Sequence, residues 1–165
     1  MSLLEMLKDA GAIKFGDFVL SSGKRSRVYI DVKQAITKPE VLEAIASQMA
    51  EKLRNVEFDR IACIELGGVP IAVALSLKTG KELVIFRKKR KEYGTGDDRI
   101  GEIRKGERVV VVEDVITTGK SARSVIERVE ELGGEVKAVI AVVDREESDL
   151  EVISLLKLSE ILKNT

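Results

Sequence analysis

Apolar residues recur at helical spacing in several parts of this chain. Val41, Ile45 and Met49 share one face of a helix predicted over residues 38–53. A capping box that begins at Thr37 is expected to start this helix. The same kind of spacing predicts four further helices: a short one from Ser2, two over residues 69–78 and 120–132, and a last one at the C-terminus.

Short runs rich in β-branched residues predict the strands. They cover residues 18–20, 28–32, 60–64, 83–86, 108–112, 136–143 and 152–156. The central runs are continuously apolar, as strands buried on both faces of a parallel sheet are. We therefore expect an α/β protein with an open, mainly parallel, twisted sheet flanked by helices, and a small hood formed by the N-terminal elements, about residues 1–35.

The periodic pattern breaks over residues 87–106, which carry many charges and several glycines. A long segment without periodicity inside a compact domain is typically functional or disordered. Five cations in a row, residues 87–91, open this segment directly after a predicted strand. We interpret it as a mobile flap that closes over a negatively charged ligand, although a solvated charge run or a nucleic-acid patch fits the cations as well.

Composition narrows the class of protein. A length of 165 residues indicates a single domain, residues 1–165, and the balance of 28 acidic and 28 basic residues gives no general attraction to nucleic acid. No apolar run is long enough to span a membrane and the N-terminus lacks a basic leader, so a cytoplasmic location is expected. The absence of His excludes Ser-His, Cys-His and most zinc chemistry.

Residues 109–121, V-V-V-V-E-D-V-I-T-T-G-K-S, combine a buried strand, two acids and a glycine turn before a helix. Free N–H groups at the helix start and the hydroxyls of the turn suit one phosphate group, and plain helix capping is the alternative. A Walker A loop is rejected because Asp114 stands where that motif needs its first glycine.

Glu113 and Asp114 immediately precede this turn. Carboxylates accept hydrogen bonds from a vicinal diol or face a hydrated Mg²⁺, and either acid could instead be a solvated loop residue. A phosphate on the turn together with a diol on the acids describes a ribose 5-phosphate. The sequence therefore predicts a sugar-phosphate site at the carboxyl edge of the sheet.

The 109–121 segment resembles the phosphoribosyl-diphosphate signature of type I phosphoribosyltransferases. Three further segments, F-G-D-F-V-L-S-S-G-K-R-S, E-L-G-G-V-P-I-A and R-K-K-R-K-E-Y-G, are similar to orotate phosphoribosyltransferases, and the likeness covers about residues 12–146. The resemblance implies that phosphoribosyl diphosphate and orotate are the substrates, that Mg²⁺ is the cofactor, and that orotidine 5′-phosphate and diphosphate are the products. It further implies a homodimer in which the flap reaches the neighbouring subunit's site.

The resemblance also assigns roles to single residues. Thirteen would bind phosphoribosyl diphosphate: Arg87, Lys88, Lys91, Tyr93, Glu113, Asp114, Val115, Ile116, Thr117, Thr118, Gly119, Lys120 and Ser121. Thr117 and Arg145 would contact orotate, whose carboxylate suits a guanidinium. Gly67 and Gly68 would expose backbone N–H groups to diphosphate, and Lys91 and Asp114 would be catalytic. No residue is assigned as a direct metal ligand.

Several positions depart from the family's pattern. Ser21 stands where the family usually has a lysine, in the loop that covers orotate, and Lys24 or Arg25 would take the place of that lysine. Tyr93 stands where the family usually has a histidine. Two other functions therefore remain open: transfer to a purine or to uracil, and a regulator that senses phosphoribosyl diphosphate. For Arg145 the alternative is an exposed ion pair with a neighbouring glutamate.

Overall fold

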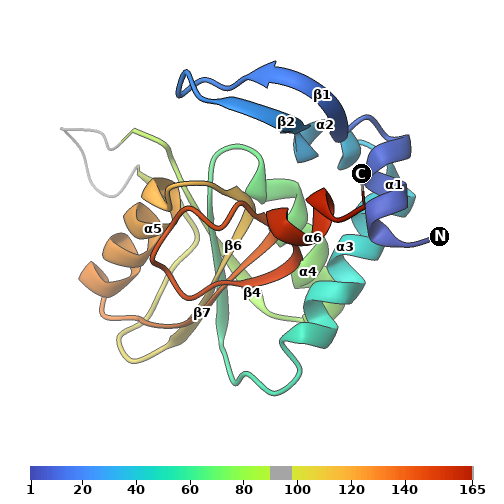
Figure 1. Cartoon of the computed structure of the whole chain (residues 1–165). Coiled ribbons are helices and arrows are strands. Elements are labelled where there is room, and N and C mark those ends of the chain that lie inside the picture. The colour runs from blue at the N-terminus through green and yellow to red at the C-terminus, as the bar shows by residue number, and fades with distance from the viewer. Residues whose placement is uncertain (90–97, 165) are drawn as a thin grey trace.

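A six-stranded sheet forms the centre of the computed structural model, which describes residues 1–89 and 98–164 (Figure 1). Its strands are β3 (Arg60–Ile64), β4 (Glu82–Phe86), β5 (Arg99–Ile100), β6 (Arg108–Ile116), β7 (Glu135–Asp144) and β8 (Ile153–Lys157). They lie in the order β5-β4-β3-β6-β7-β8, and only the edge strand β5 runs antiparallel to its neighbour. The predicted open, mainly parallel sheet is confirmed.

Both faces of the sheet are covered, because successive valines of β6 alternate between two cores. Val110 and Val112 belong to the core under α3 (Pro39–Lys52) and α4 (Gly68–Thr79). Val109 and Val111 belong to the core under α5 (Lys120–Glu131). The continuously apolar run thus has the origin that the sequence indicated. In the described part of the chain, no helix has the length and apolar character that crossing a membrane requires.

The hood consists of α1 (Leu3–Asp9), the antiparallel hairpin of β1 (Ile13–Val19) and β2 (Arg25–Ile30), and α2 (Val32–Ala35). The hairpin stands beyond one end of the strands of the sheet (Figure 1). The predicted cap at Ser2 is confirmed, since its hydroxyl accepts a hydrogen bond from the backbone N–H of Glu5. The strand predicted over 28–32 ends early because the Asp31 side chain caps α2.

Two boundary predictions are wrong for local reasons. Thr37 does not cap α3: its hydroxyl donates to the carbonyl of Gln34, and the N-cap is Lys38 with no side-chain bond. β6 does not stop at residue 112 but runs on to Ile116, because β7 continues to pair with it through Asp144. Glu113 and Asp114 are therefore strand residues, and their side chains must point to opposite faces.

The flap predicted over residues 87–106 is shorter than expected on its C-terminal side. Arg99–Ile100 form β5, and the backbone N–H of Arg87 donates to the carbonyl of Asp98. Ile103 is buried in the core under α5. Gly101 permits this return at a φ of 95°, where a Cβ would lie 2.3 Å from the carbonyl oxygen of Leu83. β5 pairs with β4 at only two positions. A strand this short has no apolar periodicity from which the sequence could predict it.

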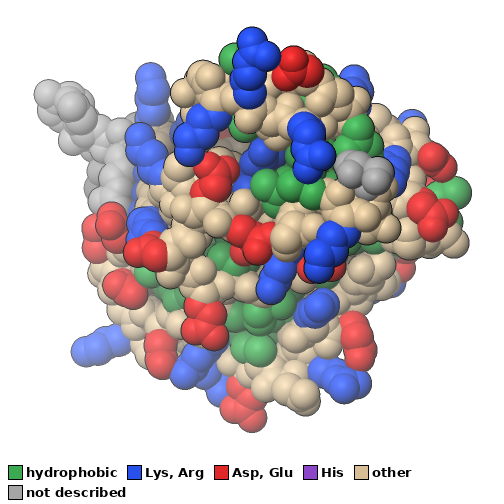
Figure 2. Space-filling view, viewed as in Figure 1, with side chains coloured by type: hydrophobic (Ala, Val, Ile, Leu, Met, Phe, Trp, Pro, Cys, Tyr) green, Lys and Arg blue, Asp and Glu red, His purple; other side chains and the backbone are tan. Residues whose placement is uncertain are grey.

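The surface carries mixed charge. On the face shown in Figure 2, basic and acidic side chains are interspersed over the hood and the sheet layer. This agrees with the balance of 28 acidic and 28 basic residues in the sequence. A face of this kind does not concentrate a field of one sign.

Candidate functional site

The two adjacent acids of β6 line two different cavities. Glu113 shares the face of Val111, toward α5, and lines a small cavity of about 120 Å³. Asp114 shares the face of Val112, toward the hood, and lines a larger cavity of about 480 Å³. This division follows from the two-residue period of a strand. The two acids thus have separate environments, and the expectation that they hold one diol stays a prediction.

The small cavity is lined by the residues that the sequence predicted to bind a phosphate. Beside Glu113 it is lined by Val115, Ile116, Thr117, Thr118, Gly119, Lys120, Ser121 and Ala122. Gly119 is the N-cap of α5 and has a φ of 88°. The first N–H groups of α5 and the positive end of its dipole therefore face this turn. We call these residues the phosphate nest.

Glu113 is only 6% exposed, and its Oε1 has no hydrogen-bond partner among the described residues. Burial, aided by the charge of Asp114, raises the pKa of Glu113 to about 8. The carboxyl group is therefore mostly protonated at neutral pH, and it can donate a hydrogen bond. An acid beside the nest consequently does not repel a phosphate as a carboxylate would.

Asp114 lies against the loop between β3 and α4. A Cβ added to Gly67 would be 2.1 Å from Oδ2 of Asp114, and one added to Gly68 would be 2.9 Å from the carbonyl oxygen of Val112. The paired glycines thus let this loop close onto β6, a contact that the sequence did not predict. The peptide bond between Glu65 and Leu66 in the same loop is cis.

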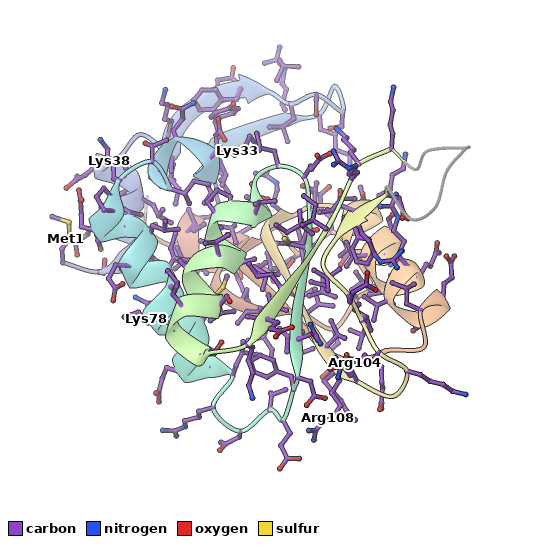
Figure 3. The ribbon with its side chains drawn as sticks, turned by 180° about the vertical axis from the view of Figure 1, so that it is seen from behind. Met1, Lys33, Lys38, Lys78, Arg104 and Arg108 are labelled. Carbon is purple, nitrogen blue, oxygen red and sulfur yellow. The ribbon has the colours of Figure 1, made fainter. Side chains whose placement is uncertain are left out.

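The larger cavity lies between the hood and the strand ends. From the hood it is lined by Val19, Leu20, Ser21, Ser22, Lys24, Tyr29, Ile30, Asp31, Val32 and Lys33, and from the sheet side by Asp114, Val115, Thr117, Thr118, Arg145 and Glu147. Lys33 Nζ is 3.4 Å from Asp31 and 4.0 Å from Asp114. Figure 3 shows Lys33 beside the hairpin, at the end of the sheet opposite Arg108.

Arg145 is buried, whereas the alternative to orotate binding was an exposed arginine paired with a neighbouring glutamate. Its side chain is 8% exposed, and its backbone N–H donates to the carbonyl of Ile116 at the end of β6. Nε of Arg145 lies 3.6 Å from a carboxylate oxygen of Glu147. Thr117, predicted with Arg145 to contact orotate, lines the same cavity.

The cations of the predicted flap are only partly within the described residues. Arg87 and Lys88 are exposed just after β4, whereas Lys91 and Tyr93 lie outside the described residues. The backbone N–H of Lys88 donates to the Glu65 side chain over 2.9 Å. The root of the flap is thus joined to the glycine loop.

Sequence reasoning missed two residues that line the site and a third that supports the root of the flap. Lys33 and Glu147 look like ordinary charged residues until the fold brings both to the larger cavity. Arg128 is buried on α5, and its guanidinium donates to the carbonyl of Arg87 over 2.6 Å. Only Arg128 had a signal, because it follows Val125 by three residues on the apolar face of the predicted helix.

The described residues offer no ready-made metal cage. Among them, no group of three or more Cys, Asp or Glu side chains is placed to hold an ion. Asp114, with a side chain 14% exposed, can still present a carboxylate to the larger cavity. Such a donor set fits Mg²⁺ that arrives with phosphate oxygens and water, which is how this ion commonly binds.

Comparisons with known proteins agree with this geometry. The phosphoribosyl transferase domain matches residues 32–162 of the chain. An orotate phosphoribosyltransferase of Archaeoglobus fulgidus is 65% identical over 162 residues, which covers 98% of this chain and 91% of that protein. One from Thermococcus gammatolerans is 52% identical over 147 residues, with 88% of this chain and 78% of that protein covered.

A solved structure extends the likeness to three dimensions. The crystal structure of orotate phosphoribosyltransferase from Aeropyrum pernix superposes with a TM-score of 0.87 at 34% sequence identity. The match covers 99% of this chain and 97% of that one, so it includes the hood as well as the sheet.

Proposed function

This chain belongs to the orotate phosphoribosyltransferase family of phosphoribosyl transferases, and we propose that its two adjoining cavities carry out the family's reaction. The enzyme transfers the 5-phosphoribosyl group of phosphoribosyl diphosphate to orotate, giving orotidine 5′-phosphate and diphosphate for pyrimidine nucleotide synthesis. One observation carries the assignment: the phosphate nest opens beside a cavity that contains a carboxylate, Asp114, and a buried guanidinium, Arg145.

The sugar phosphate is held by the residues after β6. Backbone N–H groups at the start of α5, with the hydroxyls of Thr117, Thr118 and Ser121, bind the 5-phosphate. The protonated carboxyl group of Glu113 adds a donor at the same place. Asp114, on the other face of the strand, accepts hydrogen bonds from ribose hydroxyls in the larger cavity.

The base occupies the larger cavity, on the side of Arg145. Arg145 pairs with the carboxylate of orotate, and this orients a ring nitrogen toward the anomeric carbon. That nitrogen is acidic enough to need little general-base help, so a chain with no His suffices. Positive charge develops on the sugar as diphosphate departs, and Asp114 stabilises it.

Diphosphate leaves toward the glycine loop and the root of the flap. Backbone N–H groups at Gly67 and Gly68 and the side chains of Arg87 and Lys88 receive its charge, and Lys91 is proposed to act with them. Mg²⁺ held by substrate oxygens and Asp114 would neutralise part of the same charge. Closure of these cations over the site keeps water from the activated sugar.

The activity is tested by mixing the protein with Mg²⁺, phosphoribosyl diphosphate and one base, and following the absorbance of that base. We expect orotate to be consumed and adenine, guanine and uracil to persist, because only orotate offers a carboxylate to Arg145. Omission of Mg²⁺ should slow turnover by at least about tenfold. Consumption of a purine while orotate persists would refute the choice of base.

A homodimer is proposed from an apolar surface on α4. Val73 and Leu77 are 40% and 84% exposed and lie one turn apart on this helix. Leu66, 70% exposed, lies in the loop before it. Exposed apolar residues that cluster in this way mark interaction surfaces. A second copy of the chain is the partner, which would bring one flap to the neighbouring site.

Leu77→Glu is expected to weaken the dimer by at least about tenfold, because it places a charge in an apolar contact. Analytical ultracentrifugation of the wild type and the variant measures this. Val19→Glu, the same kind of change on the exposed hood surface, should leave the dimer intact. A wild type that sediments as a monomer, or a Leu77→Glu protein that dimerises normally, would contradict the proposal.

Two further expectations stay predictions. These are the cytoplasmic location and the lack of nucleic-acid and membrane partners, and the charge balance bears on the nucleic-acid partner alone. A gel shift with and without phosphoribosyl diphosphate tests the regulator alternative directly. A shifted band that depends on this ligand would favour it.

A further inference from the structure

Glu147 lies between two cations at the larger cavity. Its carboxylate is 3.6 Å from Nε of Arg145 and 3.7 Å from Nζ of Lys24. Arg145 belongs to the segment after β7, whereas Lys24 belongs to the turn between β1 and β2. All three side chains line the cavity proposed to receive orotate. A carboxylate of the chain itself therefore stands beside the guanidinium that the substrate's carboxylate needs.

The pairing of Arg145 with Glu147 is loose. Arg145 is more than nine-tenths buried, and its Nε has no hydrogen-bond partner among the described residues. The 3.6 Å separation from Glu147 is an ion-pair distance and exceeds that of an ordinary hydrogen bond. A buried guanidinium in this state retains donors for a better-placed carboxylate.

Glu147 is held less tightly by the fold than Arg145, because it is more exposed and lies outside any strand. Its side chain is 31% exposed, and that of its other partner, Lys24, is 73% exposed. Ion pairs with exposed partners contribute little, so Glu147 can exchange Arg145 for water at a small cost. It lies on the irregular segment between β7 and β8, and no strand pairing fixes its backbone.

We propose that Glu147 is an internal competitor of the substrate carboxylate and thereby sets how tightly the cavity holds an acidic base. This inference rests on the proposed function. Before binding, Glu147 partly neutralises Arg145 and Lys24. The carboxylate of orotate displaces it from Arg145, and its return promotes release of the carboxylate-bearing product. The wild-type chain thus binds orotate more weakly than its cations alone would allow.

The test compares orotate with its carboxamide, which has the same ring without the charge. Glu147→Gln should lower the dissociation constant of orotate by about three- to fivefold, the contribution of a partly exposed ion pair. The dissociation constant of the carboxamide should change less than about twofold. Isothermal titration calorimetry gives both values, and the KM for orotate should fall without a rise in kcat.

Glu151→Gln provides the matched control, because it removes the same charge from an exposed residue of the same segment. It should leave orotate binding unchanged. Equal affinity of wild type and Glu147→Gln for orotate, or weaker binding by the variant, would overturn the inference alone. Failure of the wild type to bind orotate at all would overturn the proposed function and this inference together. Equal gains for orotate and the carboxamide would also refute it, since the carboxylate would then not be the competitor.

Discussion

Asp114→Asn is expected to lower kcat/KM for orotate by about 10²–10³-fold while the protein stays folded. The change keeps the shape of the side chain and removes the charge that faces the developing positive charge on the sugar. The ion pair that is lost contributes little to stability, because Lys33 lies 4.0 Å away and its side chain is 53% exposed. The melting temperature should therefore match that of the wild type, and binding of ribose 5-phosphate should weaken.

Two other variants sharpen this test. Gly67→Ala leaves Asp114 in the chain but displaces its carboxylate, because the added Cβ would lie 2.1 Å from Oδ2. We expect a loss of turnover similar in kind to that of Asp114→Asn. Asp17→Asn makes the same chemical change at an exposed ion pair on the hood and should be fully active. Normal turnover by Asp114→Asn or by Gly67→Ala would contradict the role of this carboxylate.

The main architecture was predictable because it depends on long apolar patterns. The run from Val109 to Val112 is short, β-branched and continuously apolar, which favours a strand buried on two sides, and its residues fill both cores in alternation. The boundaries that failed depend on single competing hydrogen bonds. Asp31 starts a helix inside a predicted strand, and Gln34 takes the Thr37 hydroxyl away from α3. Local hydrogen bonds of this kind between side chain and backbone leave no periodic pattern in the sequence.

The part of the site that is formed by consecutive residues was predictable from the sequence. The nest follows directly from the turn at Gly119 and the helix after it, and both were visible in the sequence. The contacts of Lys33 with Asp114 and of Glu147 with Lys24 join segments far apart in the chain. The position of the hood on the sheet decides which of these charges meet. The sequence pattern does not predict that position.

The raised pKa of Glu113 leads to the second prediction, a dependence of the protein's stability on pH. Burial raises its pKa from 4.5 to about 8, so between these values the folded chain keeps a proton that the unfolded chain has lost. The free energy of unfolding must then fall as pH rises through that window, by an amount on the order of 5 kcal/mol. The chain has no His to titrate in the same range. Hydrogen bonds from Arg108 lower the pKa of Asp59 to about 2. Asp59 therefore changes the free energy of unfolding only below this pH window, and there stability rises with pH.

Glu113→Gln should remove this pH dependence, because a glutamine imitates the protonated acid and cannot lose a proton. Urea unfolding without Mg²⁺ or ligand should give equal free energies for wild type and variant near pH 5, and a variant more stable by a few kcal/mol near pH 9. Glu127→Gln, an exposed change on α5, should follow the wild type at every pH. A wild type with constant stability across the window, or a Glu113→Gln protein with the wild-type slope, would show that this carboxyl is ionised in the fold. The nest would then hold a negative charge of its own, and a phosphate could bind there only against it.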